Sequence, residues 1–177
     1  MNHDSYPDDY IADILNDCRT IAMIGASANT SRPSYFAMKY LLGKGYTVHP
    51  VNPGLAGQSL LGQTVYGDLA DIPAPVDMVD IFRNAEAAHG VTKQAIDLKD
   101  ALDVKVVWMQ LGVCNEEAAE LAEAASLRVV MNRCPKIEYG RLSGEIGWAG
   151  VNSGVISSVR PKLAPAGVQS RMIRTRT

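Results

Sequence analysis

The chain has 177 residues, of which 47% are hydrophobic and 20% are charged, and its formal net charge at pH 7 is −2. This length and composition suit one domain with a buried core, and the small net charge gives no indication of nucleic-acid binding. No apolar stretch approaches the roughly 20 residues that cross a bilayer. The acidic first residues lack the apolar segment of a signal peptide. We therefore expect a cytoplasmic protein that binds neither nucleic acid nor membranes.

Short apolar runs alternate with helix-like segments along the chain. The expected strands cover residues 20–25, 46–51, 76–82, 104–110 and 128–132, and the expected helices cover 8–18, 33–43, 86–101 and 116–127. The apolar runs are continuous, as in strands that are buried on both faces. The Gly-rich segment 54–75 is expected to be irregular, with one short strand near 64–66. The sequence thus predicts an α/β fold: a Rossmann-like, doubly wound, mainly parallel sheet of about five strands with helices on both faces.

The last part of the chain differs in charge from the rest. No acidic residue follows Glu145, whereas several lysines and arginines do. We expect a single domain over residues 1–160 and a basic, flexible tail over 161–177, because the tail has few apolar residues and no periodic pattern. The alternative is an arm that docks on an acidic surface of this chain or of a partner. The sequence leaves open whether the chain forms a homo-oligomer or binds a partner protein.

The cysteines and histidines form neither a disulfide framework nor a structural metal site. Cys18, Cys114 and Cys134 are odd in number and widely spaced, with no CxxC pair, and the three histidines do not cluster. We expect free thiols, as in a reducing compartment, and no bound metal.

In open parallel sheets, ligands bind beyond the carboxyl ends of the strands. The first strand–helix turn is the strongest candidate, because a turn of small residues before a helix N-terminus favours an anion through free N–H groups and the helix dipole. Gly25 and Ala26 let the backbone approach a phosphate, and Ser27 offers a hydroxyl. Arg32 could pair with phosphate oxygens, and Pro33 suits the first helical position.

Two features that the sequence lacks constrain the identity of the nucleotide. The fingerprint G-x-G-x-x-G is absent, since Ser27 and Thr30 replace its second and third glycines. The segment 49–53, at the end of the second expected strand, has no acidic residue to bind the ribose of NAD. A cofactor with a phosphorylated ribose is therefore favoured, and both NADP and coenzyme A qualify.

No catalytic group can be assigned from the residues. Ser27, Cys114 and Cys134 are nucleophile candidates. Among the segments that follow the strands, only the second has a histidine, His49, and the sequence does not assign it as the base for any of the three. We expect binding without catalysis, and the roles of the two cysteines stay open.

Six short motifs follow one another at the successive strand ends: IAMIGAS, RPS, VNP, DIFR, WMQLG and MNRCP. In this order they resemble the small stand-alone coenzyme A-binding domain proteins, which are similar in turn to the coenzyme A-binding half of the succinyl-CoA ligase alpha subunit. The resemblance covers residues 10–145.

The resemblance implies a coenzyme A site spread over five loops. The resemblance places Gly25, Ala26 and Ser27 at the pyrophosphate, with Arg32 and Pro33 nearby, and Asn52 and Pro53 at the adenosine. It places Phe82 and Arg83 at the middle of the cofactor, and Gln110 and Gly112 nearer the pantetheine arm. Asn132 and Arg133 belong to a run that matches the ligase with one residue inserted. The function expected is binding of coenzyme A, of an acyl-CoA or of a CoA disulfide. The alternative is an NADP-dependent oxidoreductase.

Overall fold

The structure is a computed structural model that describes residues 3–145 and residue 173. The chain divides into two compact units, one of Cys18–Cys134 and one that joins Met1–Asp17 to Pro135–Thr177, and each is described by itself. The predicted domain end at residue 160 and the predicted tail 161–177, apart from Ile173, lie outside the described residues.

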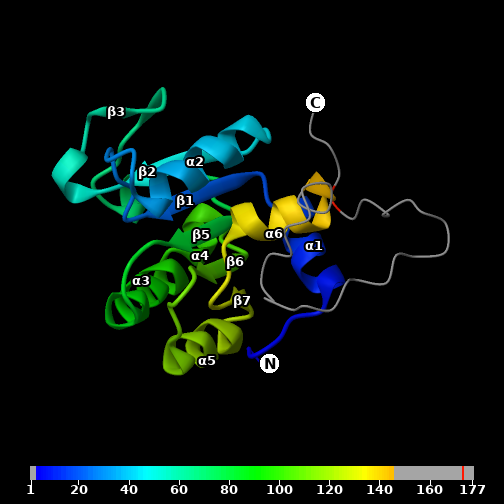
Figure 1. Cartoon of the computed structure of the whole chain (residues 1–177). Helices are drawn as coiled ribbons and strands as arrows, with labels where there is room; N and C mark the ends of the chain where they lie inside the picture. The colour runs from blue at the N-terminus through cyan, green and yellow to red at the C-terminus, as the bar shows by residue number, and fades with distance from the viewer. Residues whose placement is uncertain (1–2, 146–172, 174–177) are drawn as a thin grey trace. The chain divides into compact units, whose positions relative to one another are not determined.

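A five-stranded parallel sheet forms the centre of the unit Cys18–Cys134 (Figure 1). The strands are β1 (Thr20–Ile24), β2 (Thr47–Val51), β5 (Met78–Ile81), β6 (Val106–Met109) and β7 (Arg128–Val130), in the order β2-β1-β5-β6-β7. All four pairings between neighbouring strands are parallel. All carboxyl ends of the strands therefore meet at one edge.

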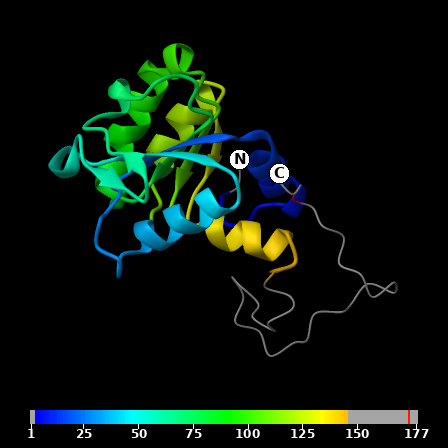
Figure 2. The ribbon, with the colours of Figure 1, turned by 90° about the horizontal axis from the view of Figure 1, so that it is seen from above.

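Helices cover both faces of this sheet. They are α2 (Pro33–Gly43), α3 (Ala85–Asp97), the single turn α4 (Lys99–Leu102) and α5 (Glu116–Ala124). Figure 2 shows α2 on one face and α3 with α5 on the other. The predicted Rossmann-like α/β fold is confirmed.

The core follows the alternation of side chains along the strands. Ala22, Val79, Ile81 and Val107 belong to an apolar cluster that also includes buried alanines of α3 and α5. The alternate positions of the strands point to the opposite face. Most of them are also buried and apolar, and the exceptions are the buried Asp80 in β5 and the half-buried Arg128 at the start of β7.

The segment between β2 and β5 is largely irregular, as expected, but it contains a small hairpin. It includes the 3-10 turns η1 (Pro53–Leu55) and η2 (Leu69–Asp71) and the antiparallel strands β3 (Ser59–Leu60) and β4 (Gln63–Thr64). Tyr66, in the predicted short strand, forms one parallel bridge with Val51.

The second unit contains the helices α1 (Asp8–Asp17) and α6 (Pro135–Leu142), which contact each other. Arg141 joins them, because its guanidinium lies 2.7 Å from Asp8 Oδ1 and also donates to Glu138 Oε2. The helix α1 was predicted, whereas α6 was not. No helix in the described part of the chain is long and apolar enough to span a membrane.

Candidate functional site

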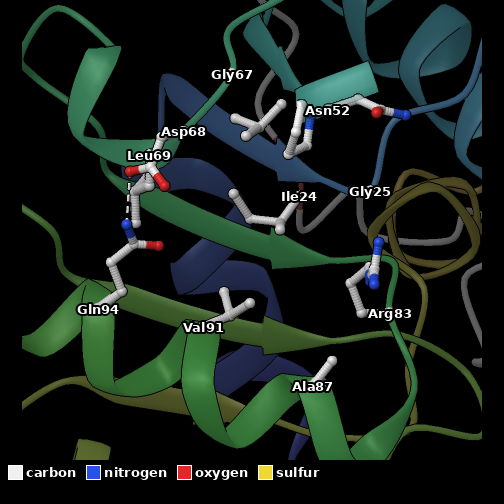
Figure 3. Close-up of a pocket in the computed structure, with 12 residues that line it drawn as sticks. Ile24, Gly25, Asn52, Gly67, Asp68, Leu69, Arg83, Ala87, Val91 and Gln94 are labelled. Atoms are coloured by element: carbon white, nitrogen blue, oxygen red, sulfur yellow. Dashed lines mark hydrogen bonds between the residues drawn. The ribbon is translucent and has the colours of Figure 1, made fainter. Parts of the chain in front are cut away.

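A cavity opens at the carboxyl edge of the sheet, beside the ends of β1 and β2. The chain leaves β1 toward β2 on one side and leaves β5 toward β6 on the other, so the strand order reverses at the pair β1–β5. This is the place where open α/β sheets bind ligands. The cavity measures about 240 Å³. Its walls are apolar and its rim carries polar groups (Figure 3), with Ile24, Val51, Leu69, Ala87 and Val91 among the former and Asn52, Asp68, Arg83 and Gln94 among the latter.

Gly25 ends β1 in a conformation that needs glycine. Its φ is +87°, and a Cβ placed on it would lie 2.5 Å from the carbonyl oxygen of Phe82 and 2.9 Å from Cδ of Arg83. The absence of a side chain thus lets the end of β1 pack against the loop that follows β5. Gly25 also lines the cavity.

The turn after Gly25 offers an anion fewer donors than the sequence predicts. The N–H groups of Gly25 and Ala26 both donate to the Val51 carbonyl, at 3.0 and 3.2 Å. The free N–H groups that we expect at this turn are therefore not those of Gly25 and Ala26, because both are bonded to the end of β2.

Some of the N–H groups at the start of α2 also have hydrogen-bond partners in the backbone of the same segment. Pro33 has no N–H, and the N–H groups of Tyr35 and Phe36 donate to the carbonyl of Arg32, whose side chain makes no cap. Ser27 Oγ accepts from the N–H of Asn29 at 3.2 Å. The helix dipole and the exposed Arg32 guanidinium remain as features that favour an anion. Ser27, Arg32 and Pro33 lie outside the set that lines the cavity.

Asn52 fixes the wall of the cavity on the β2 side. Its Nδ2 donates to the Ala26 carbonyl at 2.7 Å, and its Oδ1 accepts from the N–H of Gly54 at 2.9 Å. It therefore ties the end of β2 to the β1–α2 turn, a role that spacing alone does not show. Pro53 follows it and also lines the cavity.

Arg83 supplies the positive charge of the cavity. It is exposed, and Figure 3 shows its guanidinium at the end of the cavity beside Gly25. Phe82, next to it, is half-buried and donates its N–H to the Ile24 carbonyl at 2.8 Å. Phe82 is not among the residues that line the cavity, whereas Arg83 is.

The remaining predicted residues gather at the ends of β6 and β7, away from the set that lines the cavity. The N–H of Gly112 donates to Asn132 Oδ1 at 2.9 Å, and Nη1 of Arg133 donates to the Asn132 carbonyl at 2.8 Å. Gln110 is buried, and its Nε2 donates to Asp80 Oδ1 at 2.7 Å. These contacts hold the two loops together and engage the amide donor of Gln110 inside the protein.

Asp80 is a buried acid that our sequence analysis did not single out. It is fully buried, and burial raises its pKa to about 7 although the hydrogen bond from Gln110 lowers it. Its Oδ2 has no hydrogen-bond partner among the described residues. The signal in the sequence is an aspartate in the middle of the apolar run VDMVDIF.

Asp68 and Gln94 were missed as well, because they come from the irregular segment and from the middle of α3. Gln94 Nε2 donates to Asp68 Oδ1 at 2.6 Å at the rim of the cavity. The available signal for Gln94 was its helical spacing from Ala87 and Val91, which places all three on one face of α3. Asp68 brings a carboxylate to an edge whose predicted strand-end positions contain none.

The nucleophile candidates do not line the cavity. Cys114 is exposed and Cys134 is buried. His49 packs edge-on against Tyr66, and burial lowers its pKa. Within the part of the chain that the structure describes, no group of three His, Cys, Asp or Glu side chains is arranged to hold a metal ion.

Comparison with protein families assigns the chain. The model of the CoA binding domain matches residues 19–140, which include the whole sheet and every residue that lines the cavity. The chain belongs to the CoA binding domain family.

Two relatives are similar to this CoA-binding-domain chain over most of their own length. The uncharacterized protein YneT of Bacillus subtilis (strain 168) is 32% identical over 129 residues, which cover 73% of this chain and 91% of that protein. The structure of a hypothetical protein from Pyrococcus horikoshii OT3 is similar with a TM-score of 0.72 and 37% identity, over 80% of this chain and 95% of that one.

A larger enzyme contains a similar domain. The dinucleotide forming acetyl-coenzyme A synthetase 1 of Ca. Korarchaeum cryptofilum, solved in complex with phosphate and ADP, matches with a TM-score of 0.57 and 25% identity. The match covers 70% of this chain and 28% of that enzyme.

Proposed function

We propose that the chain binds coenzyme A, or an acyl-CoA or CoA disulfide, at the carboxyl edge of its sheet and catalyses no reaction of its own. The observation that carries this proposal is the cavity at the reversal of strand order, in a chain that belongs to the CoA binding domain family.

The chemistry of the cavity fits one part of such a cofactor. Cavities that bind whole drug-sized ligands measure about 300–1,000 Å³, so a cavity of about 240 Å³ accommodates a moiety rather than the complete cofactor. Its apolar walls suit a purine ring, and Arg83 suits the adjoining phosphates. The remainder of the cofactor would then follow the strand ends, where the predicted residues Ser27, Arg32 and Gln110 lie.

The absence of catalysis is proposed from the groups that line the cavity. They include no cysteine, serine or histidine, and Asp68 is the acid among them. A hydride-transferring enzyme that uses NADP needs a proton donor beside the nicotinamide, whereas the carboxylate of Asp68 accepts hydrogen bonds from Ala70 and Gln94. Binding of NADP remains the alternative that the experiment must exclude.

The cellular location is part of the proposal. None of Cys18, Cys114 and Cys134 forms a disulfide bond in the structure. Cysteines that are kept as thiols are typical of a reducing compartment, which supports a cytoplasmic protein.

Thermal melts with coenzyme A and with NADP test the ligand. A ligand that binds only the folded state stabilises it by about 2.7 kcal/mol at 100 times its dissociation constant. We expect coenzyme A to raise the melting temperature by several degrees, and NADP at equal concentration to leave it nearly unchanged. A shift with NADP but none with coenzyme A would overturn the proposal.

A further inference from the structure

The two ends of the cavity carry opposite charges. Arg83 lies at the end beside Gly25, and Asp68 lies with Gln94 at the other end (Figure 3). Among the described residues that line the cavity, Arg83 is the one cation and Asp68 the one anion. Apolar side chains, including Ile24, separate them. A ligand that fills the cavity therefore lies with one end near a positive charge and the other end near a negative charge.

The carboxylate of Asp68 is held in place by a local network. Its Oδ1 accepts from the N–H of Ala70 at 2.9 Å and from Gln94 Nε2 at 2.6 Å. The N–H of Asp68 in turn donates to Asp71 Oδ2 at 3.1 Å, which completes a capping box at η2. The orientation of the carboxylate is therefore fixed by backbone and side-chain contacts together.

This network also orients Gln94. A carboxylate only accepts hydrogen bonds, so the amide must turn its Nε2 toward Asp68 and its Oε1 away from it. In Figure 3 the second oxygen of Asp68 and the amide oxygen of Gln94 lie on the side that faces Ile24. This end of the cavity thus presents hydrogen-bond acceptors above apolar walls.

We propose that Asp68 and Gln94 determine the specificity of the cavity for a 6-amino purine over a 6-oxo purine. A 6-amino group offers N–H donors to these acceptors, whereas a 6-oxo group places an acceptor against a carboxylate. Phosphate groups are repelled by Asp68 and attracted by Arg83, so they lie at the opposite end. This inference rests on the proposed function, because it assumes that the purine end of the cofactor enters the cavity.

The test compares ADP with IDP, which differ at position 6 of the purine, by calorimetric titration. We expect the parent protein to bind ADP about fivefold more tightly than IDP, as for one net hydrogen bond. In Asp68→Asn the ratio should fall to about one or reverse, because asparagine still caps η2 but can donate to a 6-oxo group.

Asp71→Asn is the matched control. Asp71 belongs to the same capping box as Asp68 but does not line the cavity. It should keep the parent ratio of ADP to IDP affinity, even where it lowers the melting temperature. A loss of the ratio in both variants would mean that the capping box acts through loop structure, and would overturn the inference.

Titration with coenzyme A separates this inference from the proposed function. If coenzyme A binds but ADP and IDP bind equally, or ADP does not bind at all, base recognition by Asp68 and Gln94 is wrong while the function stands. If Asp68→Asn keeps the preference for ADP, the inference is also wrong. If neither coenzyme A nor ADP binds, both fail.

Discussion

The pKa values of Asp77 and Asp80, two aspartates of one apolar run, shift in opposite directions. Burial alone would raise the pKa of Asp77, but the bond from Lys105 Nζ at 2.8 Å and the N–H groups of Arg19 and Thr20 outweigh it and lower the pKa. Asp80, three residues later, has burial as the dominant effect and receives one bond from Gln110. Its sheet neighbours, Met23 and Trp108, carry no charge.

Asp80 should make the stability of the fold depend on pH. Its pKa of about 7 in the folded state exceeds the ordinary value of 3.8, so the folded protein holds a proton that the unfolded chain has released above pH 4. The free energy of unfolding therefore falls as pH rises toward 7 and is level above it. Asp80→Asn cannot ionise, so its stability relative to the parent should rise by about 1–3 kcal/mol from pH 5 to pH 8.

Urea denaturation of both proteins at pH 5 and pH 8 measures this effect. The difference between the two proteins is the informative quantity, since other groups such as His49 titrate in both and cancel. A difference that does not change with pH would show that Asp80 is ionised throughout this range.

The β1–α2 turn depends on Gly25. In Gly25→Ala the methyl group would meet the Phe82 carbonyl at 2.5 Å, and the backbone would retain a φ of +87°. Gly112 has a similar φ of +77°, but a Cβ there has nothing within 4 Å. Gly112→Ala should therefore cost about 1 kcal/mol of stability, and Gly25→Ala should cost clearly more, by about 2 kcal/mol.

Denaturant unfolding of the two glycine variants checks this comparison. Because both positions share the positive φ, the difference between them isolates the contact with the β5–α3 loop. Equal costs would contradict the packing that forms this side of the cavity.

The sequence predicted the elements with strong local signals and missed those that depend on tertiary contacts. The apolar runs and capped helices determined the sheet and its neighbouring helices, in chain order. The helix α6 was missed because the sequence analysis predicted no element after the strand 128–132, although a proline such as Pro135 suits the first position of a helix. The prediction of a continuous helix over 86–101 was wrong as well, since a break at Leu98 separates α3 from α4.

The sequence predicted that the site lies at the carboxyl edge of the sheet, but it predicted only some of the residues that line the cavity. Gly25, Asn52, Pro53 and Arg83 were predicted and do line it. Asp68 was missed because it enters from an irregular segment, whose path depends on bonds such as that between Asn52 N–H and the Tyr66 carbonyl. Roles for Ser27, Arg32 and the residues of the β6 and β7 loops remain predictions.

In the molecule as a whole, the proposed coenzyme A site lies at one edge of a parallel sheet. Two arginines at opposite edges of the sheet serve as matched test positions. Arg83 follows β5 at the carboxyl edge, and Arg19 precedes β1 at the opposite edge. Both are exposed, so replacing either by alanine removes the same charge without opening the core.

Calorimetric titration of coenzyme A into the parent, Arg83→Ala and Arg19→Ala tests whether the cofactor binds at the carboxyl edge. Loss of a phosphate-binding arginine should weaken binding about tenfold, which corresponds to about 1.4 kcal/mol. We predict this loss in Arg83→Ala and unchanged affinity in Arg19→Ala. Equal affinities of all three proteins, or no binding by the parent, would contradict a coenzyme A site at the carboxyl edge.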